Sequence, residues 1–271
     1  MYISRDGVKL FYREEGSGSP ALVFVHGGGV DHSTWDEHMA HFASRHRVVA
    51  MDLRGHGQSD PGPPYTSDVF RDDLAVVIQQ LGLAPAVVVG ASRGAGIANR
   101  VATDYPGLVQ ALVFVDYGAA PRQSESAPWA DTPEQTRAVL DSLGADWRTN
   151  GARRLVDSWF PEPGVPEALK ERLANMCRKT PAEVVAEIRL RDVDESDRED
   201  YLRRVTVPTL VLQGTSRSHQ GREQGQFIAE RVPGARLQYF EGRGHGFFMS
   251  APEDFWQAVE AFLDHVMAAP R

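Results

Sequence analysis

The stretch VVVGASRGAGIA, residues 87–98, says more about the fold class than any other part of the chain. It begins as an apolar, β-branched run and ends as a helical pattern, and Gly90 to Gly94 between them matches G-x-S-x-G. In a sharp strand-to-helix turn of this kind the serine adopts a strained backbone, and the glycines let strand and helix approach closely. This context predicts Ser92 as a nucleophile. The alternative interpretation is a turn that only joins two elements.

Apolar runs and helical patterns alternate on both sides of this turn. Near-continuous β-branched runs that alternate with helices are typical of a parallel sheet covered on both faces. The strand-like runs are residues 21–25, 46–53, 86–90, 111–116, 207–214 and 235–242. No such run occurs from about residue 121 to 204, where prolines and aromatic residues lie in amphipathic stretches. We therefore expect an α/β core, residues 1–120 and 206–271, interrupted by a helical cap of residues 121–205.

Two glycine-rich loops follow predicted strands and carry histidine. In the first, the run from His26 to Gly29 leaves backbone N–H groups unhindered by side chains, so we expect the N–H groups of Gly28 and Arg93 to bind an oxyanion. A merely flexible loop is the alternative, and His26 is expected to brace it. In the second loop, EGRGHG, His245 lies between the last strand and the last helix, where it can act as general base to Ser92.

With the loop DLRGHGQSD, residues 52–60, these motifs appear in the order found in the α/β-hydrolase superfamily. The chain resembles that superfamily over about residues 8–118 and 206–268. The resemblance implies the α/β-hydrolase fold, a mostly parallel eight-stranded sheet flanked by helices, with a helical cap as insertion. Within the loop, Arg54 and His56 are expected to shape the mouth of the site.

The catalytic acid is the open question. In most members of the superfamily it follows the strand represented here by TLVLQG, but no aspartate or glutamate occurs between Gly214 and Arg222. Asp116 ends the preceding core strand, and we predict it as the acid that orients His245. The arrangement is similar to that of fungal zearalenone lactonases. An aspartate that only caps a turn is the alternative; the remoter candidates for the acid are Glu223, Asp192, Asp194 and Asp197.

The composition of the chain limits the kinds of partner that we expect it to bind. The 271 residues are 42% hydrophobic and 24% charged, with a net charge of −8 and no basic run, which argues against a nucleic-acid partner. A metal site from His32, His38 and His41 would need a fourth group, so we expect no metal, and no cofactor either. The single cysteine, Cys177, excludes an intrachain disulfide and fits a reducing compartment. With no signal peptide or membrane span apparent, we expect a cytoplasmic protein without a membrane partner.

These features together predict a serine hydrolase that cleaves an ester or lactone of an apolar small molecule by a Ser-His-Asp mechanism. A zearalenone-type macrolactone is one candidate substrate. Aromatic residues of the cap either line the substrate site or attach the cap to the core; they are Trp129, Trp147, Trp159 and Phe160. The rival functions on the same fold are a natural-product cyclase, a cofactor-free dioxygenase and a small-ligand receptor.

Overall fold

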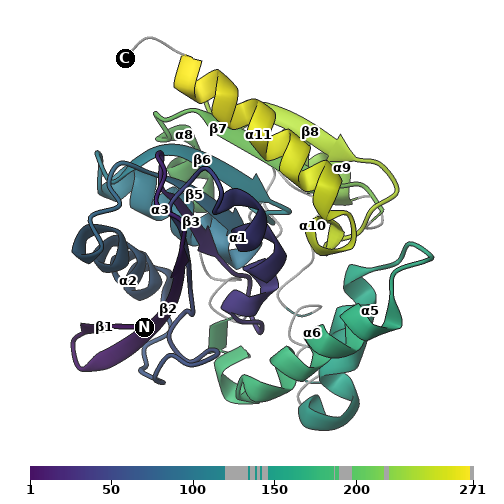
Figure 1. The fold of residues 1–271 in the computed structure, drawn as a ribbon. Coiled ribbons are helices and arrows are strands. Elements are labelled where there is room, and N and C mark those ends of the chain that lie inside the picture. The colour runs from purple at the N-terminus through teal and green to yellow at the C-terminus, as the bar shows by residue number, and fades with distance from the viewer. Residues whose placement is uncertain are drawn as a thin grey trace.

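The computed structural model describes residues 1–119, 134, 138, 141, 146–185, 187–188, 197–216 and 220–268 (Figure 1). Every structural statement below concerns these residues. Within them, no helix is both long and apolar enough to cross a membrane.

The described strands form one eight-stranded sheet in the order β1-β2-β4-β3-β5-β6-β7-β8. The first two strands are antiparallel to their neighbours, and the remaining six are parallel, which confirms the predicted fold class. Asp6 and Gly7, both at positive φ, make the tight turn between β1 and β2. The strands are β1 Tyr2–Arg5, β2 Val8–Glu15, β3 Leu22–Val25, β4 Val48–Met51, β5 Ala86–Ala91, β6 Val109–Val115, β7 Thr209–Gly214 and β8 Arg236–Phe240.

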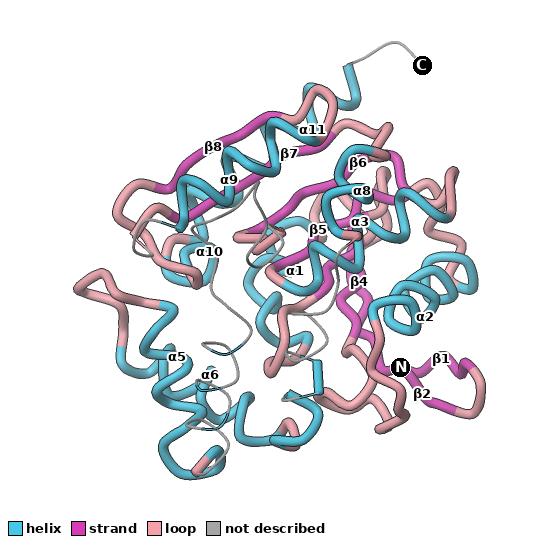
Figure 2. Tube along the Cα trace, turned by 180° about the vertical axis from the view of Figure 1, so that it is seen from behind, coloured by secondary structure: helices cyan, strands magenta, loops and turns pink. Residues whose placement is uncertain are grey.

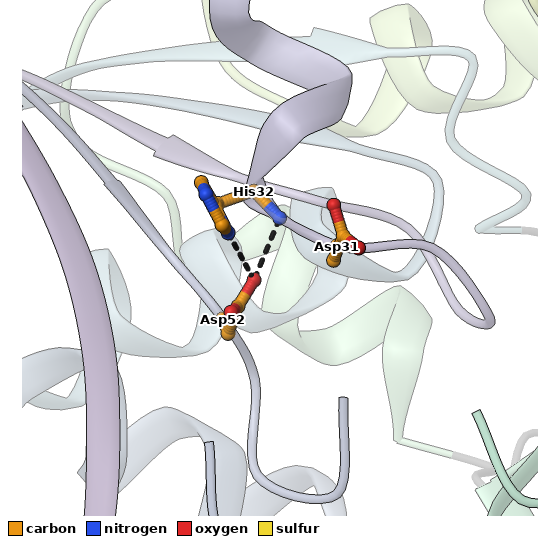
Figure 3. A group of neighbouring side chains, drawn as sticks. All are labelled: Asp31, His32 and Asp52. Atoms are coloured by element: carbon orange, nitrogen blue, oxygen red, sulfur yellow. Dashed lines mark hydrogen bonds and ion pairs between the residues drawn. The ribbon is translucent and has the colours of Figure 1, made fainter. Parts of the chain in front are cut away.

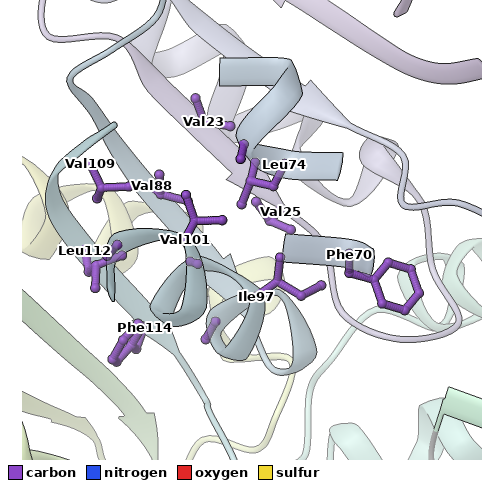
Figure 4. Packing of buried hydrophobic residues seen from close by; sticks show 14 of the residues in the cluster. Val23, Val25, Phe70, Leu74, Val88, Ile97, Val101, Val109, Leu112 and Phe114 are labelled. Atoms are coloured by element: carbon purple, nitrogen blue, oxygen red, sulfur yellow. The ribbon is translucent and has the colours of Figure 1, made fainter. Parts of the chain in front are cut away.

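Helices cover both faces of the sheet, which explains why β3, β4 and β5 carry no polar side chain. In β3, Val23 and Val25 face one hydrophobic cluster while Leu22 and Phe24 face another. Figure 4 shows the first cluster, where α2 and α3 pack on the sheet. The helices of the core are α1 Asp36–Phe42, α2 Ser67–Gln80, α3 Arg93–Asp104, α8 Arg198–Arg203, α9 Gln220–Arg231, α10 Phe247–Ser250 and α11 Pro252–Ala268, with a short 3₁₀ helix at His32–Trp35.

Two further helices, α5 Ala152–Trp159 and α6 Glu167–Lys179, lie together, apart from those that cover the sheet, in both views (Figures 1 and 2). With the helical turn Trp147–Gly151 they enclose a third hydrophobic cluster, to which the core contributes Val30. We call residues 146–185 the cap. Leu202 of α8 packs instead in the first cluster of the core.

Candidate active site

Ser92 occupies the turn between β5 and α3 with φ 52° and ψ −114°. This is the left-handed region that L-residues avoid, so the sharp turn is strained as the motif predicts. A Cβ on Gly90 would collide with the backbone of Gly94, and one on Gly94 would collide with the backbone of Val25. The partly exposed Ser92 side chain makes no capping hydrogen bond to α3. Its hydroxyl is therefore presented at the end of the strand.

Asp116 directly follows β6, and its buried carboxylate is hydrogen-bonded to the ring of His245 through Oδ2 and Nδ1. Its other oxygen, Oδ1, accepts hydrogen bonds from the Gly214 N–H at 3.1 Å and from Gln213 Nε2 at 2.6 Å. Asp116 itself has φ 47°, a conformation that aspartate tolerates better than most residues. The carboxylate is thus held by donors from two other strand ends.

The position after β7, where an acid was missing, is occupied by residues that bond to the end of β8. The Ser216 N–H donates to the Arg243 carbonyl at 2.9 Å, and the Thr215 N–H donates to the Phe240 carbonyl at 3.2 Å. Of the remoter acid candidates, Asp197 pairs with Arg100 at 2.6 Å, and Glu223 lies in α9. Asp192 and Asp194 lie outside the described residues.

The glycine loop after β3 lies against the turn that carries Ser92. A Cβ on Gly27 would lie 3.4 Å from Ser92 Cβ, whereas one on Gly28 would have no neighbour within 4 Å. The Gly29 N–H donates to His56 Nε2 at 3.2 Å. For the Gly28 N–H, by contrast, no acceptor exists among the described residues. Within the described residues, the Gly28 N–H is therefore an unused donor in the loop that lies against the Ser92 turn.

Two buried histidines hold this loop in place. His26 donates from Nδ1 to the Gly27 carbonyl at 2.7 Å and accepts the Leu53 N–H at Nε2, 3.0 Å away. His56 donates from Nδ1 to the Arg54 carbonyl at 3.1 Å, which leaves its Nε2 to accept from Gly29. Burial lowers the pKa of His26, and burial with the neighbouring His26 ring lowers the pKa of His56 to about 3. Both rings are therefore neutral braces.

Arg54 does not open onto the site as the sequence suggests. Its guanidinium is buried and forks onto Asp73, with Nε–Oδ2 and Nη2–Oδ1 distances of 2.6 Å each. Its Nη1 donates to the Gly62 carbonyl at 2.8 Å. Arg54 thus ties the loop 52–60 to α2, because a buried cation requires a charged partner and complete hydrogen bonding.

Asp31, His32 and Asp52 form a cluster that could surround an ion, with ligand atoms within 4.8 Å of one another (Figure 3). The carboxylates of Asp31 and Asp52 already accept hydrogen bonds from neighbouring residues. Asp52 Oδ1 accepts from the backbone N–H and the Nδ1 of His32 at 2.7 and 2.8 Å, and Asp31 accepts from Ser33 N–H at 3.0 Å. Burial alone would raise the pKa of Asp52, but the hydrogen bonds from His32 and from the Gln58 N–H lower it. The cluster is a structural clamp.

The other two histidines of the candidate metal set have different partners. His38 accepts the Trp256 indole N–H at 2.9 Å, and the His41 ring stacks on Trp256 with centroids 4.2 Å apart. Each of the three histidines therefore contributes to local packing.

Cap aromatics occupy two different environments. Trp147 donates its indole N–H to the Cys177 and Thr180 carbonyls at 3.1 and 3.0 Å, so it stabilises the interior of the cap. Trp159 lies beside the His245 ring, with centroids 5.8 Å apart, and Phe160 packs on Gly246. Trp129 lies outside the described residues.

Sequence reasoning missed Gln213 as a partner of Asp116. The sequence does show a polar residue at the end of an apolar strand, in VLQG. A glutamine at such a buried position requires hydrogen-bond partners for its side-chain amide.

Comparison with known proteins adds independent information. The profile described as the alpha/beta hydrolase family matches residues 22–258. A non-heme haloperoxidase from Rhodococcus erythropolis is 31% identical over 256 residues, which cover 89% of this chain and 90% of that protein. The 3-oxoadipate enol-lactonase 2 of Acinetobacter baylyi is 27% identical over 248 residues, covering 90% and 88%. The structure of an esterase from Exiguobacterium antarcticum superposes with a TM-score of 0.90 at 25% identity, covering 98% and 99%.

Proposed function

Because the chain belongs to the alpha/beta hydrolase family, we propose that it hydrolyses a carboxylic ester or lactone of an apolar small molecule. The observation that carries this proposal is the hydrogen bond from His245 Nδ1 to Asp116, at the strand end next to the Ser92 turn. That bond assigns the Nδ1 proton and leaves Nε2 as the basic nitrogen of the ring. Esterases and an enol-lactonase among the similar proteins agree with it.

The reaction proceeds through a covalent acyl-enzyme. His245 Nε2 takes the proton of Ser92 Oγ as the oxygen attacks the carbonyl carbon, and Asp116 stabilises the imidazolium that forms. The imidazolium then protonates the leaving alcohol, and the C–O bond of the ester breaks. Water, deprotonated by His245, attacks the acyl group and releases the acid and free Ser92.

The oxyanion is bound by the N–H groups of Gly28 and Arg93. Gly28 lies in the loop after β3, where its N–H has no acceptor among the described residues, and Arg93 begins α3, whose N-terminus carries a partial positive charge. Removing one such donor costs about 10²–10³ in rate in related chemistry. His26 and His56 contribute by fixing the path of the glycine loop.

The substrate proposal rests on Trp159. Its indole lies beside the base and gives the acyl or alcohol portion an apolar surface. We therefore place aliphatic or ring-bearing esters and lactones first, with a zearalenone-type macrolactone as the largest candidate.

The test is a panel of p-nitrophenyl acyl esters, an enol-lactone and a macrocyclic lactone, assayed with the wild type and with Ser92→Ala. We expect cleavage by the wild type and a loss of at least about 10³-fold in Ser92→Ala. A fluorophosphonate should label the wild type and not the variant. Equal cleavage by both proteins would refute the proposal. Because one relative is named a non-heme haloperoxidase, peroxide-dependent bromination is assayed in parallel.

A further inference from the structure

The two glycines that flank His245 are required for an unusual reason. Neither Gly244 nor Gly246 has a positive φ, so conformational freedom does not explain them. A Cβ on Gly244 would collide with the Trp159 carbonyl and the Pro161 ring, and one on Gly246 would collide with the Phe160 ring. The loop that carries His245 is therefore pressed against the end of α5 in the cap.

Hydrogen bonds join the two segments on both sides of His245. The Gly244 N–H donates to Glu162 Oε2 at 3.0 Å, and the Gly246 N–H donates to the Trp159 carbonyl at 3.2 Å. The Ser250 hydroxyl donates to Glu162 Oε1 at 3.3 Å, so each oxygen of this carboxylate contacts the region around the histidine. A carboxylate is a stronger acceptor than a carbonyl, which makes Glu162 the principal anchor.

We propose that Glu162 is a positioning residue for His245, so that the cap fixes the catalytic base as well as covering the site. This inference rests on the proposed function. Asp116 holds one edge of the imidazole, but the placement of the other nitrogen also depends on the backbone that carries the ring. Glu162 and Trp159 of the cap hold that backbone by accepting from the Gly244 and Gly246 N–H groups. A displacement of about 1 Å at a reacting group can cost about 10²-fold in rate.

A purely structural role for Glu162 makes a different prediction. If it only attached the cap, its loss would loosen the cap, raise KM and lower the melting temperature, while kcat would be retained. A positioning role lowers kcat and leaves KM nearly unchanged, because substrate contacts remain while the base is misplaced.

The experiment compares Glu162→Ala, Glu162→Gln and the control Glu167→Ala. Glu167 is an exposed cap carboxylate paired with Arg153, so its loss removes a charge without touching the histidine loop. We expect Glu162→Ala to lower kcat by about 10-fold with KM within about twofold, and Glu162→Gln to recover part of kcat because its amide oxygen still accepts from Gly244. Glu167→Ala should match the wild type. Unchanged kcat in a folded Glu162→Ala, or an increase in KM alone, would overturn the inference.

A second readout separates this inference from the proposed function. Amide hydrogen exchange of residues 243–246 should accelerate in Glu162→Ala and not in Glu167→Ala. If the wild type cleaves no ester or lactone, the proposed function fails, while the exchange data still report whether Glu162 holds the loop. Exchange unchanged in Glu162→Ala would overturn the inference even in an active enzyme.

Discussion

Two aspartate–histidine pairs lie at strand ends of the same sheet: Asp116 with His245 after β6, and Asp52 with His32 after β4. Both carboxylates are buried, and both accept a hydrogen bond from an imidazole Nδ1. The difference is in the remaining contacts. Asp52 also accepts the backbone N–H of the same histidine, so both of these bonds fix His32 in place. Asp116 instead accepts hydrogen bonds from Gln213 and Gly214 at the end of the neighbouring strand β7.

The two pairs also differ in their place in the sheet relative to Ser92. β6 is the direct neighbour of β5, which leads into Ser92, whereas β3 separates β4 from β5. Since neighbouring strands lie about 4.8 Å apart, Asp52 starts about one strand further from the nucleophile. An aspartate–histidine hydrogen bond therefore does not by itself identify a catalytic pair, because the imidazole must also reach the nucleophile.

The largest effect that would test this comparison is expected from Asp116→Asn. The amide can still accept from Gly214, but it cannot stabilise the imidazolium, so kcat/KM should fall by about 10⁴-fold with a minor change in melting temperature. Initial rates of ester cleavage provide the measurement. Near-full activity would mean that another carboxylate acts as the acid, with Glu223 the first to be replaced.

Asp52→Asn should have the opposite profile. Loss of the charged acceptor for His32 and Gln58 is expected to lower the free energy of unfolding by about 3 kcal/mol, with kcat/KM changed by less than about tenfold. Denaturant unfolding, with kinetics on the folded fraction, measures both quantities. A stable variant with a 10³-fold loss of activity would contradict the structural role of this pair.

A buried histidine without a carboxylate should weaken the fold in acid. Burial, with His41 and Arg172 nearby, lowers the pKa of His38 from 6.5 to about 3. As the pH falls below 6.5 the unfolded chain binds this proton first, so stability is full above pH 6.5 and declines down to about pH 3. The loss reaches about 2 kcal/mol at pH 5.

His38→Gln should remove that part of the pH dependence, whatever its effect on stability at pH 7. Unfolding free energies measured from pH 7 to pH 4 should decline less steeply than in the wild type. The exposed His265 provides the control, since His265→Gln should leave the slope as it is. Parallel curves for His38→Gln and the wild type would show that this ring is not responsible.

The smallest effect is expected from Gln213→Leu, which removes the side-chain donor from β7 to Asp116 Oδ1. The Gly214 N–H remains, so kcat should fall by about 10-fold, corresponding to about 1.4 kcal/mol. Gln226→Leu is the matched control, because Gln226 is exposed and bonds only to Glu230 among the described residues. If both variants retain full kcat, the hydrogen bond from Gln213 to Asp116 is not needed for catalysis.

The candidate catalytic side chains could be named from the sequence because each lies in a recognisable local pattern. Ser92 lies in a spaced glycine motif, His245 lies in a glycine-flanked loop, and Asp116 ends an apolar run. Parallel strands bring their carboxyl ends to one edge of the sheet, so the order of elements already implied that these residues lie at that edge. Arg54 was expected at the mouth of the site, but nothing in its own loop shows that its partner is Asp73 on α2.

The sequence by itself determined the parallel sheet, its covering helices and the strand ends that carry the candidate nucleophile, acid and base, because apolar periodicity and turn chemistry depend on neighbouring residues. Only the tertiary structure decided what holds those groups. Gln213 reaches Asp116 across 97 positions of the chain, and the Gly244 N–H reaches Glu162 across 82. Such contacts depend on how separate elements pack, and no pattern within one element records them.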